Sequence, residues 1–320
     1  MEQDLIAQIW PQIIWPILRI TFFITVGLFI ANMIESLNWT HRLATLARPL
    51  IKIGRLSSIT GASFSVAFFS GVSANSMLAE AYDQKKMDID ELIFANLFNS
   101  LPRFFLHLPT VFFLTAPLIK GAAVIYVGLT FSAALLQTFL VVLGGRLFLS
   151  VKKYEEHTTI QTRKKTNWKQ AFEKSVKRLR KRIIKILKFM IPVYTLFFLL
   201  NRFGFFTQLE DFIANRAWFL SWLNPQSLGI VILHISAEFS AGLAAASVLL
   251  AQNSLSYRDV VLALLAGNIL AAPIRALRHQ LPYYTGIFSP KLAVILVGIS
   301  QSVRAFCVIM VAICYYYFTL

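Results

Sequence analysis

The sequence predicts an all-α membrane protein built from two repeats that have opposite orientations in the bilayer. Three observations support this fold class. The chain of 320 residues is 57% hydrophobic and only 14% charged, with a mean hydropathy of +0.64, whereas soluble domains carry about 25% charged residues. Several stretches exceed the roughly 18 apolar residues that are needed to cross a bilayer. A polar motif also occurs twice inside such stretches, at a constant offset.

The duplicated motif has the form Asn-x6-Arg-x3-His. It occurs as Asn96, Arg103 and His107, and again 172 residues later (268 − 96) as Asn268, Arg275 and His279. Spacings of seven and eleven residues place all three side chains on one face of a helix. Ionisable groups inside apolar segments usually face a protein interior or a cavity and mark a site or a pathway. The motif therefore predicts a site where the two repeats meet.

Both halves of the chain contain the same order of elements. An apolar span (12–34, then 186–205) is followed by a second apolar stretch (61–81, then 226–252), a Pro-interrupted stretch (88–119, then 259–290) and a final, uninterrupted apolar span (121–149, then 291–318). The basic segment 41–56 predicts an amphipathic helix on the cytoplasmic surface. We therefore divide the chain into a first membrane repeat at 1–150, a linker at 151–185 and a second membrane repeat at 186–320. About six to ten membrane segments are expected.

The linker is the most basic part of the chain. Residues 151–188 contain fourteen Lys and Arg residues but only three Glu residues. The positive-inside rule places such a segment in the cytoplasm, against anionic lipid. We therefore expect a multi-pass protein of the cell membrane whose linker faces the cytoplasm. Nucleic acid is not an expected partner, because neither a folded binding module nor interleaved aromatic residues accompany the basic run.

The predicted topology depends on the Pro-interrupted stretch. The loop 83–91 has four acidic residues against two lysines, which suggests a position outside the cytoplasm. The final span of the first half must then run inward to reach the linker, so 88–119 must return to the side from which it starts. This predicts a re-entrant helical hairpin kinked near Pro102–Pro109, with a tilted and kinked full span as the alternative. Each half then crosses the membrane three times, an odd number, which makes the halves inverted repeats.

Small residues around Ala74 and Asn75 precede a Met/Leu run and then an apolar helix that ends in Asn-Ser-Leu-Pro-Arg at 99–103. Residues 71–113, which contain these motifs, resemble the Gate, or nucleoside-recognition, domain family of prokaryotic membrane proteins. Residues 238–282 look like a second, more diverged unit, so that Gate-like units cover about 61–149 and 226–318. The family includes the membrane part of FeoB-type ferrous iron permeases and relatives of concentrative nucleoside transporters.

Two departures from the iron permeases limit what the resemblance implies. The given sequence contains no P-loop motif, so the GTPase module of those permeases is not expected. Ala74 stands where those permeases often have a Cys, so metal binding by thiolate is not expected. The closest likeness is to stand-alone two-Gate membrane proteins, and the resemblance implies a transporter without naming its solute.

Polar side chains along these segments predict a cavity between the repeats, near the membrane midplane. Arginine offers a planar fork of donors that suits carboxylate or phosphate, while Asn and Ser offer neutral hydrogen bonds. The candidate solute-binding residues are Asn75, Ser76, Asn96, Asn99, Ser100, Arg103, His107, Glu238, Ser240, Asn268, Arg275 and His279. The alternative interpretation is that these groups satisfy one another and hold the helices together.

We expect a transporter or permease for a small polar solute, either anionic or zwitterionic. Glu238 or the two motif histidines are candidates for proton coupling, and cation coupling is left open. The alternative function is a non-transporting membrane scaffold or regulator that acts through the basic linker. No catalytic arrangement and no Cys or His zinc pattern is visible, so neither an enzyme nor a metal or cofactor site is expected. The expected partners are the lipid bilayer and the solute, and a homo-oligomer is left open.

Overall fold

The computed structural model describes residues 47–69, 71–149, 222–236, 239–276 and 287–319, together with 280, 281, 284 and single positions within 10–25 and 168–203. Every element within these ranges is helical, which confirms the predicted all-α class. Three helical runs are long and apolar enough to cross a membrane: Ile89–Ile119, Gly121–Phe148 and Pro290–Phe318. The predicted spans 12–34 and 186–205, and most of the linker, lie outside the described residues.

The described part of the first half begins with three short helices. These are α3 (Ala47–Ile53), α4 (Ser58–Ala67) and α5 (Gly71–Asp83). They are followed by α6 (Ile89–Phe98), α7 (Ser100–Ile119) and the long helix α8 (Gly121–Phe148). The side chain of Ser57 caps α4 by accepting a hydrogen bond from the backbone of Thr60, and Asp88 caps α6 in the same way through Glu91. These caps fix where the polar turns end and the apolar helices begin.

The described part of the second half has a similar order. A short 3-10 helix, η4 (Pro225–Ser227), leads into α11 (Leu228–Ser236), α12 (Phe239–Ala251), α13 (Tyr257–Arg275) and α15 (Pro290–Phe318). A reciprocal capping box between Ser256 and Asp259 starts α13. Pro290 stands in the first turn of α15, where its missing N–H group has no intrahelical partner to lose.

Both halves contain a pair of short helices where the sequence predicts one apolar stretch. The stretch 61–81 forms α4 and α5, and the stretch 226–252 forms α11 and α12, with the two helices of each pair packed against each other. The two helices of each pair lie side by side, as in a helical hairpin. A helix of 13 residues is about 20 Å long, too short for a hydrocarbon core of about 30 Å. Each pair therefore resembles the hairpin that the topology argument assigns to another segment.

The segment 88–119 does not form the predicted hairpin. Only Asn99 separates α6 from α7, and Ile89–Ile119 is one helical run of 31 residues that is apolar enough to cross a membrane. Pro102 lies in the first turn of α7, where proline is tolerated, and Pro109 and Pro117 lie inside α7 without ending it. This geometry favours the alternative of a kinked full span, and it moves the short hairpin to the preceding stretch of each half.

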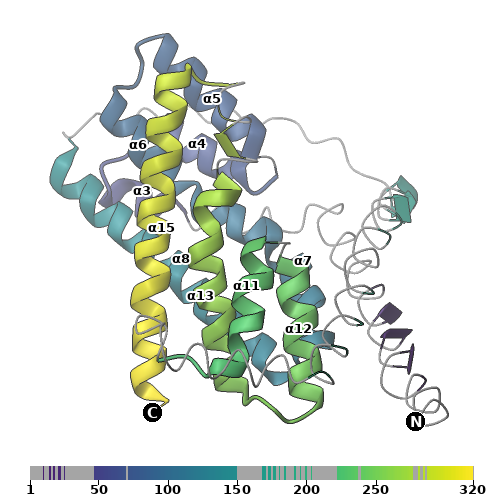
Figure 1. Cartoon of the computed structure of the whole chain (residues 1–320). Coiled ribbons are helices and arrows are strands. Elements are labelled where there is room, and N and C mark those ends of the chain that lie inside the picture. Colours follow the sequence, from purple (N-terminus) through teal and green to yellow (C-terminus); the bar gives the residue numbers. More distant parts are fainter. Residues whose placement is uncertain are drawn as a thin grey trace.

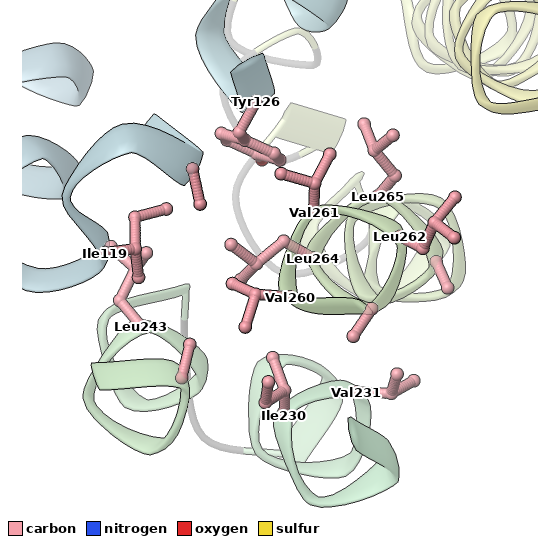
Figure 2. Packing of buried hydrophobic residues seen from close by; sticks show 14 of the residues in the cluster. Ile119, Tyr126, Ile230, Val231, Leu243, Val260, Val261, Leu262, Leu264 and Leu265 are labelled. Atoms are coloured by element: carbon pink, nitrogen blue, oxygen red, sulfur yellow. The ribbon is translucent and has the colours of Figure 1, made fainter. Parts of the chain in front are cut away.

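The two groups of helices are arranged around α15. In Figure 1, α3 to α6 gather at one end of the molecule and α11 to α13 at the other, while α15 runs beside both groups. Helix α13 lies at the centre of the largest apolar cluster. Figure 2 shows Val260 and Leu264 of α13 pointing toward Ile119 and Leu243. Association of helices in a membrane depends on such close packing, and it fixes α13 against both α8 and α12.

Candidate functional site

The two copies of the Asn-x6-Arg motif form matching contacts. In the first copy, Nη2 of Arg103 donates a hydrogen bond to the backbone oxygen of Asn96 at 2.7 Å. In the second copy, Nη2 of Arg275 donates to the backbone oxygen of Asn268 at 3.0 Å. Residues seven apart share a helix face, so each guanidinium lies back along its own helix. In both copies the arginine thus reaches the Asn position seven residues before it, whereas His107 takes no part in these contacts and His279 lies outside the described residues.

A tyrosine from the second half completes the hydrogen-bond network of the first copy. Nδ2 of Asn96 donates to the hydroxyl of Tyr284 at 3.0 Å and to Oδ1 of Asn75 at 3.3 Å. Nη1 of Arg103 donates to the same hydroxyl at 3.0 Å, and its Nε donates to the backbone oxygen of Asn99 at 3.0 Å. Asn75, Asn96 and Tyr284 are all buried. The network thus joins α5, α6 and α7 to the segment before α15.

A tyrosine from the first half completes the hydrogen-bond network of the second copy. Nδ2 of Asn268 donates to the hydroxyl of Tyr126 in α8 at 3.3 Å, and Oδ1 of Asn268 accepts from Nη2 of Arg275 at 2.6 Å. Nη1 of Arg275 lies 3.0 Å from Nε2 of His234. A guanidinium group can only donate, so Nε2 accepts and the imidazole proton is on Nδ1. That Nδ1 atom is buried and has no hydrogen-bond partner among the described residues.

A third arginine belongs to the same region. Arg304 lies midway along α15 (Pro290–Phe318) and interacts electrostatically with Arg103, Arg275 and Tyr126. An arginine at the centre of a membrane helix costs about 2.5–3.5 kcal/mol on insertion scales. This cost indicates that the position of Arg304 serves a purpose other than packing.

Arg304 lies on a face of α15 that also carries buried residues. It shares a face of α15 with Ala293, Val297 and Val308, which lie eleven and seven residues before it and four residues after it, and all three are buried. The Arg304 side chain is nevertheless exposed.

The three guanidinium groups concentrate positive charge in one region. None of them forms an ion pair with a carboxylate among the described residues. Like charges in a partly buried site repel each other. Polar groups that only hold helices together do not require this repulsion. A bound anion would relieve it.

The remaining candidate residues have different positions. Asn75, Asn96, Asn99 and Arg103 are brought together, as are Asn268 and Arg275. Oγ of Ser100 is buried and has no hydrogen-bond partner among the described residues. Ser240 is half-buried on α12, while Ser76 and His107 are exposed and take no part in the contacts given above. Glu238 and His279 lie outside the described residues, so their roles stay predictions.

Four residues of the site do not follow from the duplicated motif, namely Tyr126, His234, Tyr284 and Arg304. Two of them carried a signal in the sequence, because His234 and Arg304 are ionisable residues inside apolar helices. The span 291–318 is apolar enough to cross a membrane, as expected, and Arg304 is a charged residue within it. The tyrosines carried no such signal, since tyrosine is common in membrane proteins.

Two surface hollows have other linings. One, of about 550 Å³, is lined by Tyr82, Asp83 and residues 85–88, and the other, of about 580 Å³, is lined by residues of the linker between Phe172 and Ile184. Neither is lined by a residue of the duplicated motif. Among the described residues, no group of three or more His, Cys, Asp or Glu side chains could hold a metal ion. The charge and contacts of the arginines, rather than these hollows, define the candidate site.

Three proteins of Methanocaldococcus jannaschii are similar to this chain over most of its length. "Uncharacterized protein MJ0871" is 29% identical over 291 residues, which cover 89% of each chain. "Uncharacterized protein MJ0880" is 26% identical over 298 residues, which cover 89% of this chain and 94% of the relative. "Uncharacterized protein MJ1556" is 25% identical over 279 residues, which cover 87% and 88%. No protein-family model and no solved structure matches the chain, so the resemblance to the Gate family stays a prediction.

Proposed function

We propose that the protein is a membrane transporter or permease for a small anionic or zwitterionic solute, which binds between the two halves. The observation that carries the proposal is the pair of matching Asn–Arg contacts, each closed by a tyrosine of the other half. A solute at this place would touch both halves at once. In transporters built from inverted repeats, the substrate binds at the interface between the repeats.

The arginines keep donors that a solute can use. A guanidinium group has five N–H donors, and Arg103 uses three of them, on Nε, Nη1 and Nη2. The buried hydroxyl of Ser100 offers a further neutral partner beside Asn99. Donors that are fixed in place by neighbouring contacts lose little freedom when a solute binds. This supports a binding site for an anionic group.

The experiment is a thermal-unfolding screen of the detergent-purified full chain with carboxylates, amino acids, phosphates and nucleosides. A solute that binds only the folded state raises its apparent stability by mass action. We expect an anionic or zwitterionic solute to stabilise the protein, and Arg103→Ala combined with Arg275→Ala to abolish the shift. Arg146→Gln, an exposed arginine at the end of α8, is the matched control. Uptake of the same solute into proteoliposomes then separates transport from binding.

A scaffold or regulator that acts through the linker 151–185 is the second candidate. The observation that favours it is the linker hollow, where the apolar residues Phe172, Val176 and Ile184 are exposed beside Lys177 and Arg180. This function predicts that deletion of 155–175 destroys activity while the double arginine variant is tolerated. No stabilising solute, together with a double variant as stable as the wild type, would favour it over the transporter.

A further inference from the structure

We propose that transport is coupled to a proton, and that this proton binds to Nε2 of His234 and thereby releases Arg275. The proposal rests on the function proposed above, since it names the coupling ion of the same site. His234 lies on α11, outside the duplicated motif. It differs from the coupling candidates that the sequence suggested, which are His107, His279 and Glu238.

The contact between His234 and Arg275 exists only while the imidazole is neutral. Nη1 of Arg275 lies 3.0 Å from Nε2 of His234. A guanidinium group can only donate hydrogen bonds, and a protonated imidazole donates through both of its nitrogen atoms. A proton on Nε2 therefore removes the acceptor and sets two cationic donors against each other, which repel. Protonation of His234 and this hydrogen bond thus exclude each other.

The packing around His234 does not suit a charged ring. The side chain is 2% exposed, and its Nδ1 atom has no hydrogen-bond partner among the described residues. A Cβ atom on Gly267 would lie only 2.7 Å from Nδ1, so the backbone of α13 lies directly against this edge of the ring. A buried charge without a partner is costly. A protonated His234 must therefore move away from α13, which ties proton binding to a change in helix packing.

Few other charged or titratable groups surround His234 in the described part of the chain. The described elements η4 and α12, which pack against α11 as α13 does, contain no titratable side chain. On α13, Arg275 contacts the ring, while residues 257–259 lie at the opposite end of the helix. The hydroxyl of Tyr126 is engaged in the second copy of the motif. Glu238 joins α11 to α12, and its side chain lies outside the described residues, so its contribution is tested separately.

The contact of His234 is connected to the other half of the molecule. Nη2 of Arg275 donates to the backbone oxygen and to Oδ1 of Asn268, at 3.0 and 2.6 Å. Nδ2 of Asn268 in turn donates to the hydroxyl of Tyr126 in the first half, at 3.3 Å. Release of Arg275 therefore changes a set of hydrogen bonds that joins the halves. A ligand that binds one arrangement better than another shifts the population toward it, and here that ligand is a proton.

The first copy of the motif has no residue of this kind. Nη1 of Arg103 donates to the hydroxyl of Tyr284, which stays neutral near pH 7 because tyrosine titrates at about pH 10. The repeat offsets place Ser63 (234 − 171) or Ala62 (234 − 172) at the position of His234, and neither takes up a proton. The two halves therefore respond unequally to the same proton.

Solute and proton favour each other at this site. An anionic solute that takes the donor on Nη1 of Arg275 leaves Nε2 of His234 without its partner, and the charge of the solute favours a proton on that atom. Coupling between two ligands is reciprocal, so the proton favours solute binding by the same factor. Solute and proton are therefore carried in the same direction.

The first experiment measures the arrangement of the halves without any solute. The two cysteines of the chain are replaced by alanine, and Lys86→Cys and Gln252→Cys, both exposed and one in each half, carry spin labels. Electron paramagnetic resonance gives the distance between the labels in the detergent-purified full chain, from about pH 8 to about pH 5, the range in which histidine titrates. We expect this distance to shift with pH and the shift to be lost in His234→Gln, whose amide oxygen accepts from Arg275 but takes no proton.

Two further variants assign the proton to one residue. His107→Gln, at an exposed histidine of the first copy, is the matched control and should keep the shift, as should Glu238→Gln. Loss of the shift in either variant, or a shift that survives in His234→Gln, would assign the proton to another residue and overturn the proposal. An unchanged distance in the labelled protein without these substitutions would overturn it as well. If size exclusion shows that His234→Gln does not fold, His234→Asn replaces it with the same expectation.

The second experiment tests the coupling to a solute in proteoliposomes, with succinate and inorganic phosphate as probes. We expect an inward proton gradient to raise the uptake of the probe that the wild type transports. His234→Gln should still bind this probe in thermal unfolding but lose the dependence on the gradient. Wild-type uptake that is independent of the gradient would contradict proton coupling and leave the transporter function standing. If neither probe binds and the double arginine variant is as stable as the wild type, the proposed function fails and transport coupling fails with it, while the first experiment still decides whether His234 binds the proton.

Discussion

His234 occupies a space that two glycines leave open. A Cβ atom on Gly267 would lie 2.7 Å from Nδ1 and 2.9 Å from Cβ of His234, and one on Gly242 would lie 3.1 Å from the same Cβ atom. Glycines on α12 and α13 thus flank the imidazole from two helices. This close approach of the helices lets Nε2 of His234 reach Arg275. The absence of a side chain at Gly242 and Gly267 therefore makes room for His234, which contacts the motif residue Arg275.

We predict that Gly267→Ala displaces His234 and breaks its contact with Arg275. Overpacking of a buried site typically lowers the free energy of unfolding by about 1–3 kcal/mol, and thermal unfolding in detergent measures this loss. The control is Gly298→Ala on α15, where a Cβ atom meets nothing within 4 Å. It should leave stability unchanged or raise it by roughly 0.5–1 kcal/mol, because alanine favours helix more than glycine does. Equal stabilities of the two variants would contradict the proposed role of Gly267.

The sequence pattern was sufficient for the part of the site that lies on one helix. The spacing of Asn96 and Arg103 predicted a shared face, and a hydrogen bond between them is present. Their partner Tyr284 is 181 residues from Arg103, and only tertiary packing brings the two together. Periodicity describes contacts within a helix, so it does not find such partners. Arg304 could have been found from sequence, by the same rule that selected Arg103.

Sequence patterns likewise identify long helices but not the short helix pairs. Long spans such as 121–149 are predictable because length and apolar composition alone identify them. The short pair α11 and α12 was not predicted, because 226–252 is one continuous apolar stretch without an internal proline. Prolines were a misleading guide to the breaks. Pro102 lies in the first turn of α7, where it costs little, and the run it belongs to continues to Ile119.

We predict that residues on either side of Ile89–Ile119 face opposite sides of the membrane. Cys307 and Cys314, the two cysteines of the chain, are first replaced by alanine. Lys86→Cys and Lys120→Cys then place single thiols at exposed turns before and after the run. A membrane-impermeant thiol reagent applied from one side should label only one of the two positions. Labelling of both from the same side would restore the re-entrant hairpin at 88–119.

Moving the hairpin from 88–119 to the preceding helix pair changes the topology without changing the number of crossings. If α4 and α5 return to the cytoplasmic side and Ile89–Ile119 crosses, the first half still has three crossings. The loop 83–91 then faces the cytoplasm with the linker, which reverses the expectation from its acidic residues. Acidic residues contribute little to orientation, whereas lysines contribute strongly. Lys85 and Lys86 are therefore compatible with a cytoplasmic position.

We predict that the turns before α6 and α13 face opposite sides of the membrane. The turns before α6 and α13 occupy equivalent places in the repeats, so inverted repeats require them to face opposite sides. Lys86→Cys and Gln252→Cys, both exposed, test this in the cysteine-free protein, with Lys169→Cys marking the side of the linker.

We expect positions 86 and 169 to be labelled together from the cytoplasm, and position 252 only from the opposite side. Labelling of 86 and 252 from one side would mean that the halves run parallel. The Asn–Arg contacts of the run Ile89–Ile119 and of α13 would then approach a common solute from the same side of the membrane. A site that alternates between two openings would then lose its structural basis.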